Sequence, residues 1–233
     1  MLVFFVTLWY YNPNVGNKPH IDEASASEGN GEGQGMYKRF GKRLADILLA
    51  GLALLVLSVP MLIVALLIYC SDHGSPIFSQ KRIGCHKETF ECYKFRTMSL
   101  DAPKDVPTHL MVDPEQYFIR GGRILRKLSI DELPQLINII KGDMSIVGPR
   151  PALWNQDDLV AEREKYGAND VRPGLTGWAQ INGRDELEIP EKARLDGEYV
   201  QNMSFSFDYK CLISTFSKVI MGEGVIEGGK GNV

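Results

Sequence analysis

The 233-residue sequence has few cysteines, and no two of the four form a C-x-x-C pair. Cys85-His86 with Cys92 has no second pair of ligands at the spacing of a zinc site. This pattern argues against a disulfide framework or a structural zinc, and it favours free thiols in a reducing compartment. The four histidines are scattered, and none stands in a nucleophile–base pattern.

A large net charge and internal repeats are also absent. The formal net charge is −3, which gives no indication of nucleic-acid binding. The charge is unevenly distributed, because residues 36–100 hold nine basic and four acidic side chains around a strongly apolar run. A basic region of this kind is typical of a protein that meets an anionic membrane surface.

The first 35 residues read as an extension. Residues 1–11 are apolar but too short to span a bilayer, and no basic segment precedes them as it would in a signal peptide. Residues 12–35 are rich in Gly, Asn, Ser and Glu, a composition that predicts disorder. We therefore expect ordered structure to begin near Met36.

Residues 47–70 contain no charged side chain and are long enough to cross a membrane as a helix. Pro60 lies in the middle and predicts a kink, with Ser58 as one candidate donor to the carbonyl that the proline leaves free. Basic residues flank both ends: Lys38, Arg39, Lys42 and Arg43 before, and Lys81, Arg82, Lys87, Lys94 and Arg96 after. Both flanks then look cytoplasmic, so we expect a re-entrant membrane helix over 36–72 that enters and leaves by one face.

The remaining chain predicts a small α+β, helix-rich domain over 73–225, followed by a flexible tail over 226–233. Residues 76–98 indicate a β-hairpin with a turn near Gly84, and 99–118 a loop. Helices are expected over 120–128 and 157–166. Near the C-terminus an amphipathic helix is expected either to lie on the membrane interface or to pack on the domain.

Two adjacent carboxylates, Asp131 and Glu132, precede the apolar run 133–140. Ser129 with Glu132 fits a capping box, and Asp131 could instead be the cap, with Pro134 in the first turn. Acidic first turns are common, so a plain cap is one interpretation. Nearby arginines and glycine turns favour a metal–phosphate site instead.

The segment 171–184 combines Pro-Gly and Asn-Gly turn signals with Trp178, Gln180, Asn182 and two arginines. It could hold a nucleotide by stacking and phosphate contacts, or form a plain hairpin. The residues leave both alternatives open.

Four motifs stand in order along the chain: KFRTM at 94–98, LSIDELPQL at 128–136, GDMSIVGPRP at 142–151 and RPGLTGWAQINGR at 172–184. Together they resemble the bacterial sugar transferases, the monotopic phosphoglycosyl transferases of the compact type with a single membrane segment. The likeness covers about residues 36–225, and its one departure is that Val59, not Ser, directly precedes Pro60.

The resemblance implies transfer of a phospho-sugar from a UDP-sugar to polyprenol (undecaprenyl) phosphate, with release of UMP. It implies a covalent phospho-sugar on Asp131, Mg²⁺ held by Asp131, and an assisting role for Glu132. A carboxylate can serve as such a nucleophile, and Mg²⁺ is typically held by one or two carboxylates plus substrate oxygens. The matching basic and amide positions are assigned to phosphate or nucleotide contacts: Lys94, Arg96, Arg126, Arg150, Gln180 and Arg184.

Because UDP-sugars are cytosolic, the resemblance also places the catalytic domain on the cytoplasmic face of the bacterial inner membrane. The product would feed exopolysaccharide, capsule, lipopolysaccharide O-antigen or another glycoconjugate. Partners beyond the two substrates and membrane lipid would be a second copy of the chain or the glycosyltransferases of the pathway.

Two other functions compete with this one. A membrane-bound glycosyltransferase would move only the sugar and release UDP, but the D-x-D motif that often holds metal in such enzymes is missing. A non-enzymatic scaffold of envelope assembly would not need the dense acids and arginines of 126–150.

Overall fold

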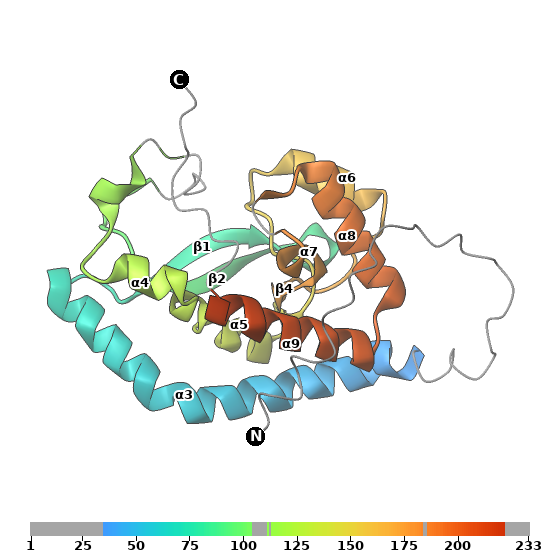
Figure 1. The fold of residues 1–233 in the computed structure, drawn as a ribbon, viewed down its shortest axis with the longest axis horizontal. Coiled ribbons are helices and arrows are strands. Elements are labelled where there is room, and N and C mark those ends of the chain that lie inside the picture. Colours follow the sequence, from blue (N-terminus) through green and yellow to red (C-terminus); the bar gives the residue numbers. More distant parts are fainter. Residues whose placement is uncertain (1–34, 104–110, 112, 184–185, 222–233) are drawn as a thin grey trace, which may run out of the picture. The chain divides into compact units, whose positions relative to one another are not determined.

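The computed structural model describes residues 35–103, 111, 113–183 and 186–221 (Figure 1). The expected extension 1–35 lies outside the described residues except for Gly35, and the expected tail 226–233 lies wholly outside them.

The described residues form a helix-rich α+β structure, which confirms the predicted fold class (Figure 1). Its first half contains a π-helical turn at Tyr37–Gly41, helix α3 at Lys42–Asp72, strands β1 at Ile77–Ile83 and β2 at Thr89–Phe95, and helix α4 at Gly122–Lys127. Its second half contains α5 at Gln135–Lys141, β3 at Ser145–Val147, α6 at Asp157–Glu164, β4 at Gly174–Thr176, α7 at Trp178–Ile181, α8 at Ile189–Asn202 and α9 at Phe205–Met221. Short 3₁₀ turns lie at Cys85–Lys87, Pro114–Tyr117 and Ile130–Glu132.

Helix α3 contains the uncharged run and is bent rather than straight (Figure 1). With the preceding turn it gives a 35-residue apolar helix, Tyr37–Ser71, long enough to cross a membrane, and only 6% of its most apolar window is buried. Pro60 lies inside the helix, and an interior proline removes a backbone hydrogen bond and bends the axis. The Ser58 hydroxyl donates to the Leu55 carbonyl at 2.8 Å, one residue before the Val56 carbonyl that Pro60 would leave free.

The first half of α3 belongs to the core of the domain. Ala50 is fully buried and packs with Leu136 and Ile139 of α5 and with Cys92 of β2. Ala53, Leu54 and Leu57 extend this contact along the same face of the helix. Small side chains such as Ala50 allow helices to approach closely, so one face of this part of the apolar run is covered by protein while its other faces stay exposed.

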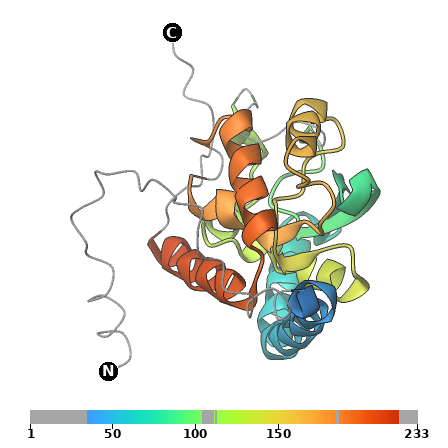
Figure 2. The ribbon, with the colours of Figure 1, turned by 90° about the vertical axis from the view of Figure 1, so that its right-hand side faces the viewer.

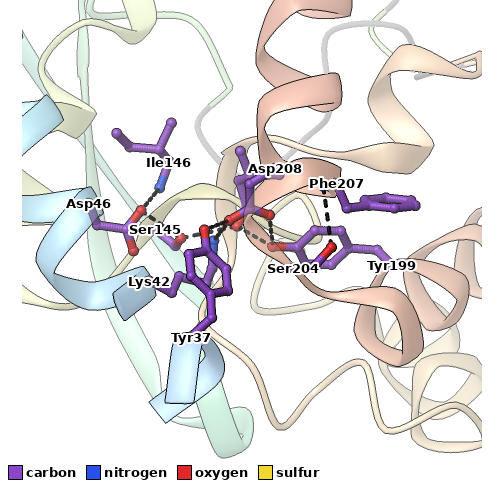
Figure 3. Close-up of polar contacts among 10 residues, drawn as sticks. Tyr37, Lys42, Asp46, Ser145, Ile146, Tyr199, Ser204, Phe207 and Asp208 are labelled. Carbon is purple, nitrogen blue, oxygen red and sulfur yellow. Dashed lines mark hydrogen bonds and ion pairs between the residues drawn. The ribbon is translucent and has the colours of Figure 1, made fainter. Parts of the chain in front are cut away.

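Polar side chains reinforce this contact at the start of α3. The Asp46 carboxylate accepts hydrogen bonds from the Ser145 hydroxyl and the Ile146 amide, both at 3.0 Å (Figure 3). Arg43 donates to the Ile139 and Ile140 carbonyls at 2.6 and 2.9 Å, near the C-terminal end of α5. Those carbonyls include groups that a helix end leaves without an intrahelical partner.

Strands β1 and β2 form the expected antiparallel hairpin, and its first arm is longer than the sequence indicated. Directly paired residues share a face, so Arg82, opposite Phe90, lies on the same face as Cys92 and Lys94. The end of β1 also reaches a distant segment, because the Ile83 amide donates to the Ala152 carbonyl at 2.9 Å.

Strands β3 and β4 pair in parallel, which excludes the simple hairpin considered for 171–184. The chain instead runs alongside β3 as β4 and then enters the short helix α7. Glycines permit the close backbone approach: a Cβ on Gly174 would lie 2.1 Å from the Gly148 nitrogen, and one on Gly177 would lie 2.0 Å from the Gly148 carbonyl oxygen.

Helices α8 and α9 complete the domain. α8 lies beside α6 (Figure 1), and the buried Asp196 accepts two hydrogen bonds from Arg163, from Nε at 2.8 Å and from a terminal nitrogen at 2.6 Å. α9 lies to one side of α3 in the view along that helix (Figure 2). α9 is amphipathic as expected: Asp208 and Cys211 are buried, whereas the apolar side chains of Phe205, Tyr209, Ile213 and Phe216 are exposed.

Candidate active site

The predicted helix caps at the acidic pair are not present. Ser129 adopts a left-handed conformation with φ of 53° and makes no side-chain cap hydrogen bond. Asp131 and Glu132 lie in the 3₁₀ turn Ile130–Glu132, and α5 begins only after Pro134. The capping-box prediction was wrong because the turn directs the acidic side chains to the interior, where Glu132 pairs with basic groups.

Glu132 is the centre of an ion-pair network. Glu132 is only 7% exposed, and its Oε1 accepts a hydrogen bond from Lys94 Nζ at 2.9 Å. The same oxygen accepts from an Arg150 terminal nitrogen, also at 2.9 Å. A buried carboxylate requires such partners, since an unpaired charge there would be strongly destabilising. Two cations from separate motifs therefore converge on one oxygen.

Asp131, also 7% exposed, has a different environment. Among the described residues, no hydrogen bond to its carboxylate is found. Burial raises the pKa of Asp131 above its ordinary value, and neighbouring Glu132 adds to this shift, whereas Lys94, Arg126 and Arg150 oppose it. Asp131 is thus a carboxylate near three cations whose oxygens are not engaged by the surrounding protein.

Arg126 approaches this site from the end of α4. Its Nε donates to the Thr97 hydroxyl at 2.8 Å, and its guanidinium lies 5.3 Å from the centre of the Phe118 ring. These contacts fix the position of the guanidinium, whose charge reaches Asp131. Arg126 thereby joins the C-terminal end of α4 to the segment 94–98.

Two other predicted substrate-binding residues, Arg96 and Gln180, contact backbone instead. Arg96 is buried and donates from Nε to the Ser75 carbonyl at 2.7 Å. Gln180 donates to the Leu175 carbonyl at 3.1 Å, while its own buried oxygen has no hydrogen-bond partner in the described structure. Arg184 lies outside the described residues. The structure thus brings Lys94, Arg150 and Arg126 to the acidic pair. Arg96 and Gln180 instead donate hydrogen bonds to nearby backbone carbonyls.

A small pocket beside Glu132 includes residues that sequence reasoning did not select. Its lining is Arg82, Cys92, Lys94, Gln135, Arg150 and Pro151. The period-two alternation of the hairpin could have placed Arg82 with Lys94, because both lie on one face. No sequence signal indicated that this face meets Pro151.

The donor set fits a magnesium ion held partly by substrate. No group of three or more His, Cys, Asp or Glu side chains suited to a metal is found among the described residues. Asp131 and Glu132 nevertheless supply two adjacent carboxylates, and the Asp131 oxygens are not engaged by protein donors. Mg²⁺ is commonly bound by one or two carboxylates together with water and phosphate oxygens.

Comparison with known proteins identifies the family. Residues 37–222 match the family model described as bacterial sugar transferase. The chain belongs to the bacterial sugar transferase family. This confirms the resemblance that the four motifs carry, and the match includes α3 as well as the domain that follows it.

Several curated proteins are similar in sequence to this bacterial sugar transferase. The uncharacterized sugar transferase EpsL of Bacillus subtilis is 44% identical over 185 residues, covering 79% of this chain and 89% of EpsL. The exopolysaccharide production protein ExoY of Sinorhizobium fredii is 38% identical, covering 78% of this chain and 87% of ExoY. The UDP-glucose:undecaprenyl-phosphate glucose-1-phosphate transferase of Escherichia coli is 40% identical over 77% of this chain, but only 40% of that longer protein is covered.

Proposed function

We propose that this chain transfers a phospho-sugar from a UDP-sugar to polyprenol phosphate and releases UMP. The observation that carries the proposal is the buried Asp131–Glu132 pair, with Lys94 and Arg150 on one Glu132 oxygen and the Asp131 carboxylate without a protein hydrogen bond. The names of relatives support the substrate class, since the Escherichia coli protein is named for glucose-1-phosphate transfer from UDP-glucose to undecaprenyl phosphate.

In the proposed reaction, Asp131 acts as the nucleophile. An Asp131 carboxylate oxygen attacks the phosphorus that bears the sugar, and the bond from that phosphorus to the bridging oxygen breaks, so that UMP leaves with the electron pair. An oxygen of the polyprenol phosphate then attacks the same phosphorus. The bond to Asp131 breaks, which regenerates the carboxylate and gives the polyprenyl-diphosphate sugar. Covalent catalysis of this kind divides one displacement into two steps.

The cations and Glu132 have supporting parts in this reaction. Lys94, Arg126 and Arg150 offset the charge of the diphosphate next to the nucleophile, as preorganised donors do in phosphoryl transfer. Asp131 would hold Mg²⁺ together with substrate oxygens, and the ion when bound would neutralise charge on the phosphate. Glu132, fixed by two cations, assists beside the nucleophile rather than replacing it.

The same proposal places the domain on the cytoplasmic face of the bacterial inner membrane, with α3 re-entrant. The bend of α3, its interior Pro60 and its exposed apolar residues support this arrangement. The exposed apolar side chains of α9 would meet the same interface, because amphipathic helices lie in the membrane plane with their apolar face buried.

The released nucleotide tests the proposal directly. Membranes containing the chain would be supplied with Mg²⁺, polyprenol phosphate and a panel of UDP-sugars, and the nucleotide would be separated and identified. UMP is the expected product, and the sugar that responds defines the donor. UDP would instead establish transfer of the sugar alone, and no nucleotide from any donor would favour the scaffold interpretation. Membranes with Asp131→Asn are the matched control for background nucleotide release.

A further inference from the structure

Three basic side chains line one small pocket beside the acidic pair. Arg82 of β1, Lys94 of β2 and Arg150, which follows β3, enclose it together with Gln135 and Pro151. The charges of Arg82, Lys94, Arg150 and Glu132 are close to one another, because Lys94 and Arg150 each lie 2.9 Å from Glu132 Oε1 and line the same pocket as Arg82. Of these four charges only Glu132 is negative, so the pocket suits an anion.

Arg82 joins the two segments that carry the other cations. One terminal nitrogen donates to the Pro151 carbonyl at 3.0 Å, directly after Arg150, and the other donates to Gln80 Oε1 at 2.7 Å. The neighbouring Ile83 amide adds a hydrogen bond to the Ala152 carbonyl. Arg82 thus fixes Arg150 against the hairpin that carries Lys94, and it adds its own charge to the pocket.

Glu132 engages Lys94 and Arg150 through a single oxygen. Lys94 Nζ and an Arg150 terminal nitrogen both lie 2.9 Å from Oε1. Lysine and arginine side chains commonly donate hydrogen bonds to phosphate oxygens in proteins. The Glu132 oxygen, which accepts from one of each, therefore occupies a position that would suit a phosphate oxygen. A phosphate that took these donors would displace the carboxylate, since two anions repel at this distance.

We propose that this pocket is a phosphate subsite in which Arg82 is the third cation, and that Glu132 occupies it until a phosphate displaces the carboxylate. The inference rests on the proposed function for its source of phosphate, which is either the nucleotide part of the donor or the head group of the polyprenol phosphate. The inference adds Arg82 as a positioning residue. It also gives Glu132 a second role, because its carboxylate competes with the substrate phosphate for Lys94 and Arg150.

Exchange of this kind links substrate arrival to the state of Glu132. Before binding, Lys94 and Arg150 restrain the Glu132 side chain. Once a phosphate accepts their hydrogen bonds, Glu132 is released beside Asp131, where the reaction takes place. Assistance from Glu132 then becomes available only when the pocket is filled.

Binding measurements on the full-length chain in lipid nanodiscs test the subsite. The probes are inorganic phosphate, UMP and farnesyl phosphate, each titrated by calorimetry into the parent chain, Arg82→Gln and Arg82→Lys. Lys81→Gln is the matched control, because Lys81 is exposed and lies on the opposite face of β1 from Arg82, across from Glu91 of β2 in the strand register. We expect Arg82→Gln to weaken phosphate binding by about tenfold or more, Arg82→Lys by less, and Lys81→Gln by under about twofold.

Glu132→Gln provides an independent arm that does not depend on Arg82. A neutral amide competes less well for Lys94 and Arg150, so inorganic phosphate should bind about fivefold tighter or more than to the parent. Parent-like binding of all three probes to Arg82→Gln, or weaker binding of phosphate to Glu132→Gln, would overturn the proposal.

The choice of probe separates the two phosphate sources and also separates this inference from the proposed function. A loss confined to UMP assigns the subsite to the donor, a loss confined to farnesyl phosphate assigns it to the acceptor, and a loss of both assigns a shared site. Inorganic phosphate binding requires no turnover. If the membrane assay released UDP while Arg82→Gln still weakened phosphate binding, the proposed function would fail and the subsite would stand.

Discussion

Lys42 Nζ lies 2.6 Å from Asp208 Oδ2, although 166 residues separate the two in sequence (Figure 3). Both side chains are largely buried. The same Asp208 oxygen accepts from the Tyr37 hydroxyl at 2.6 Å, and Oδ1 accepts from the Tyr199 hydroxyl at 2.8 Å. The start of the apolar helix is therefore fastened to α8 and α9 through one carboxylate.

Asp208→Asn should destabilise the domain strongly. The substitution leaves the Lys42 charge buried without its counter-ion, and loss of one partner of a buried pair typically costs about 3–5 kcal/mol. Thermal unfolding of the detergent-purified chain, followed by intrinsic fluorescence, measures the effect. Asp170→Asn is the control, because that carboxylate forms an exposed pair with His86. Equal unfolding temperatures for the two variants would contradict a structural role for the Lys42–Asp208 pair.

Asp46 offers a finer comparison of isosteres. One of its oxygens accepts from both the Ser145 hydroxyl and the Ile146 amide. Asp46→Asn keeps an oxygen that can accept both bonds, so stability should change by less than about 1 kcal/mol, whereas Asp46→Ala leaves buried donors unsatisfied and should cost about 1–3 kcal/mol. The same unfolding assay distinguishes them, and an asparagine variant as unstable as the alanine variant would show that the charge, not the hydrogen bonds, is required.

Gly174→Ala should prevent normal folding. Its Cβ would lie 2.1 Å from the Gly148 nitrogen, which is backbone and cannot move aside without breaking the β3–β4 pair. We expect loss of folded protein in detergent extracts, measured as the monodisperse fraction by size-exclusion chromatography. Gly51→Ala in α3 is the control, because no atom lies within 4 Å of its Cβ and alanine is the better helix former by about 1 kcal/mol. A monodisperse, parent-like yield of Gly174→Ala would show that the two strands can separate.

Substitution of Asp131 should lower turnover more than substitution of Glu132. Asp131→Asn should lower turnover by at least roughly 10³-fold, since removal of a covalent nucleophile leaves only binding and electrostatic contributions. Glu132→Gln should lower turnover by about 10²-fold, as expected for loss of an assisting group. Intact-mass spectrometry with UDP-sugar but no acceptor should reveal a phospho-sugar adduct on the parent chain. Undiminished turnover by Asp131→Asn would exclude the covalent mechanism.

Cys70 reports the side of the membrane on which α3 ends. It is exposed near the C-terminal end of the helix, whereas Cys92 and Cys211 are buried. In a Cys85→Ser background, a membrane-impermeant maleimide should modify Cys70 in inside-out vesicles and not in spheroplasts. Labelling in spheroplasts would show that α3 crosses the bilayer and would contradict the re-entrant arrangement.

Local patterns in the sequence were sufficient for the elements with local causes. The hairpin, α4, α6 and α9 follow from alternation, helical periodicity and turn residues, and they occur close to the expected positions. α8 was not anticipated, although Pro190 near its start and the spacing of Leu195 and Tyr199 are helical signals.

Features that depend on distant contacts could not be predicted from local pattern. β3 and β4 have three residues each, too few for alternation to indicate a strand, and their pairing depends on the backbone approach at Gly148 and Gly174. At the site, the motifs named Glu132, Lys94 and Arg150, and the structure brings them together. The capping pattern misled because Ser129 has a positive φ, and Arg82 was missed because its partner Pro151 lies 69 residues away.

The attachment of α3 through Arg43, Asp46 and Ala50 has a consequence for evolution and engineering. An anchor that only tethered its enzyme could be exchanged freely among relatives or deleted to give a water-soluble fragment. Helix α3 contributes side chains to the interior of the domain, so a chimera would have to inherit matching residues on α5 and β3, and on α9 where Asp208 meets Lys42. Helix α3 and the rest of the domain should therefore be inherited as one unit, with substitutions on α3 compensated in the elements that it contacts.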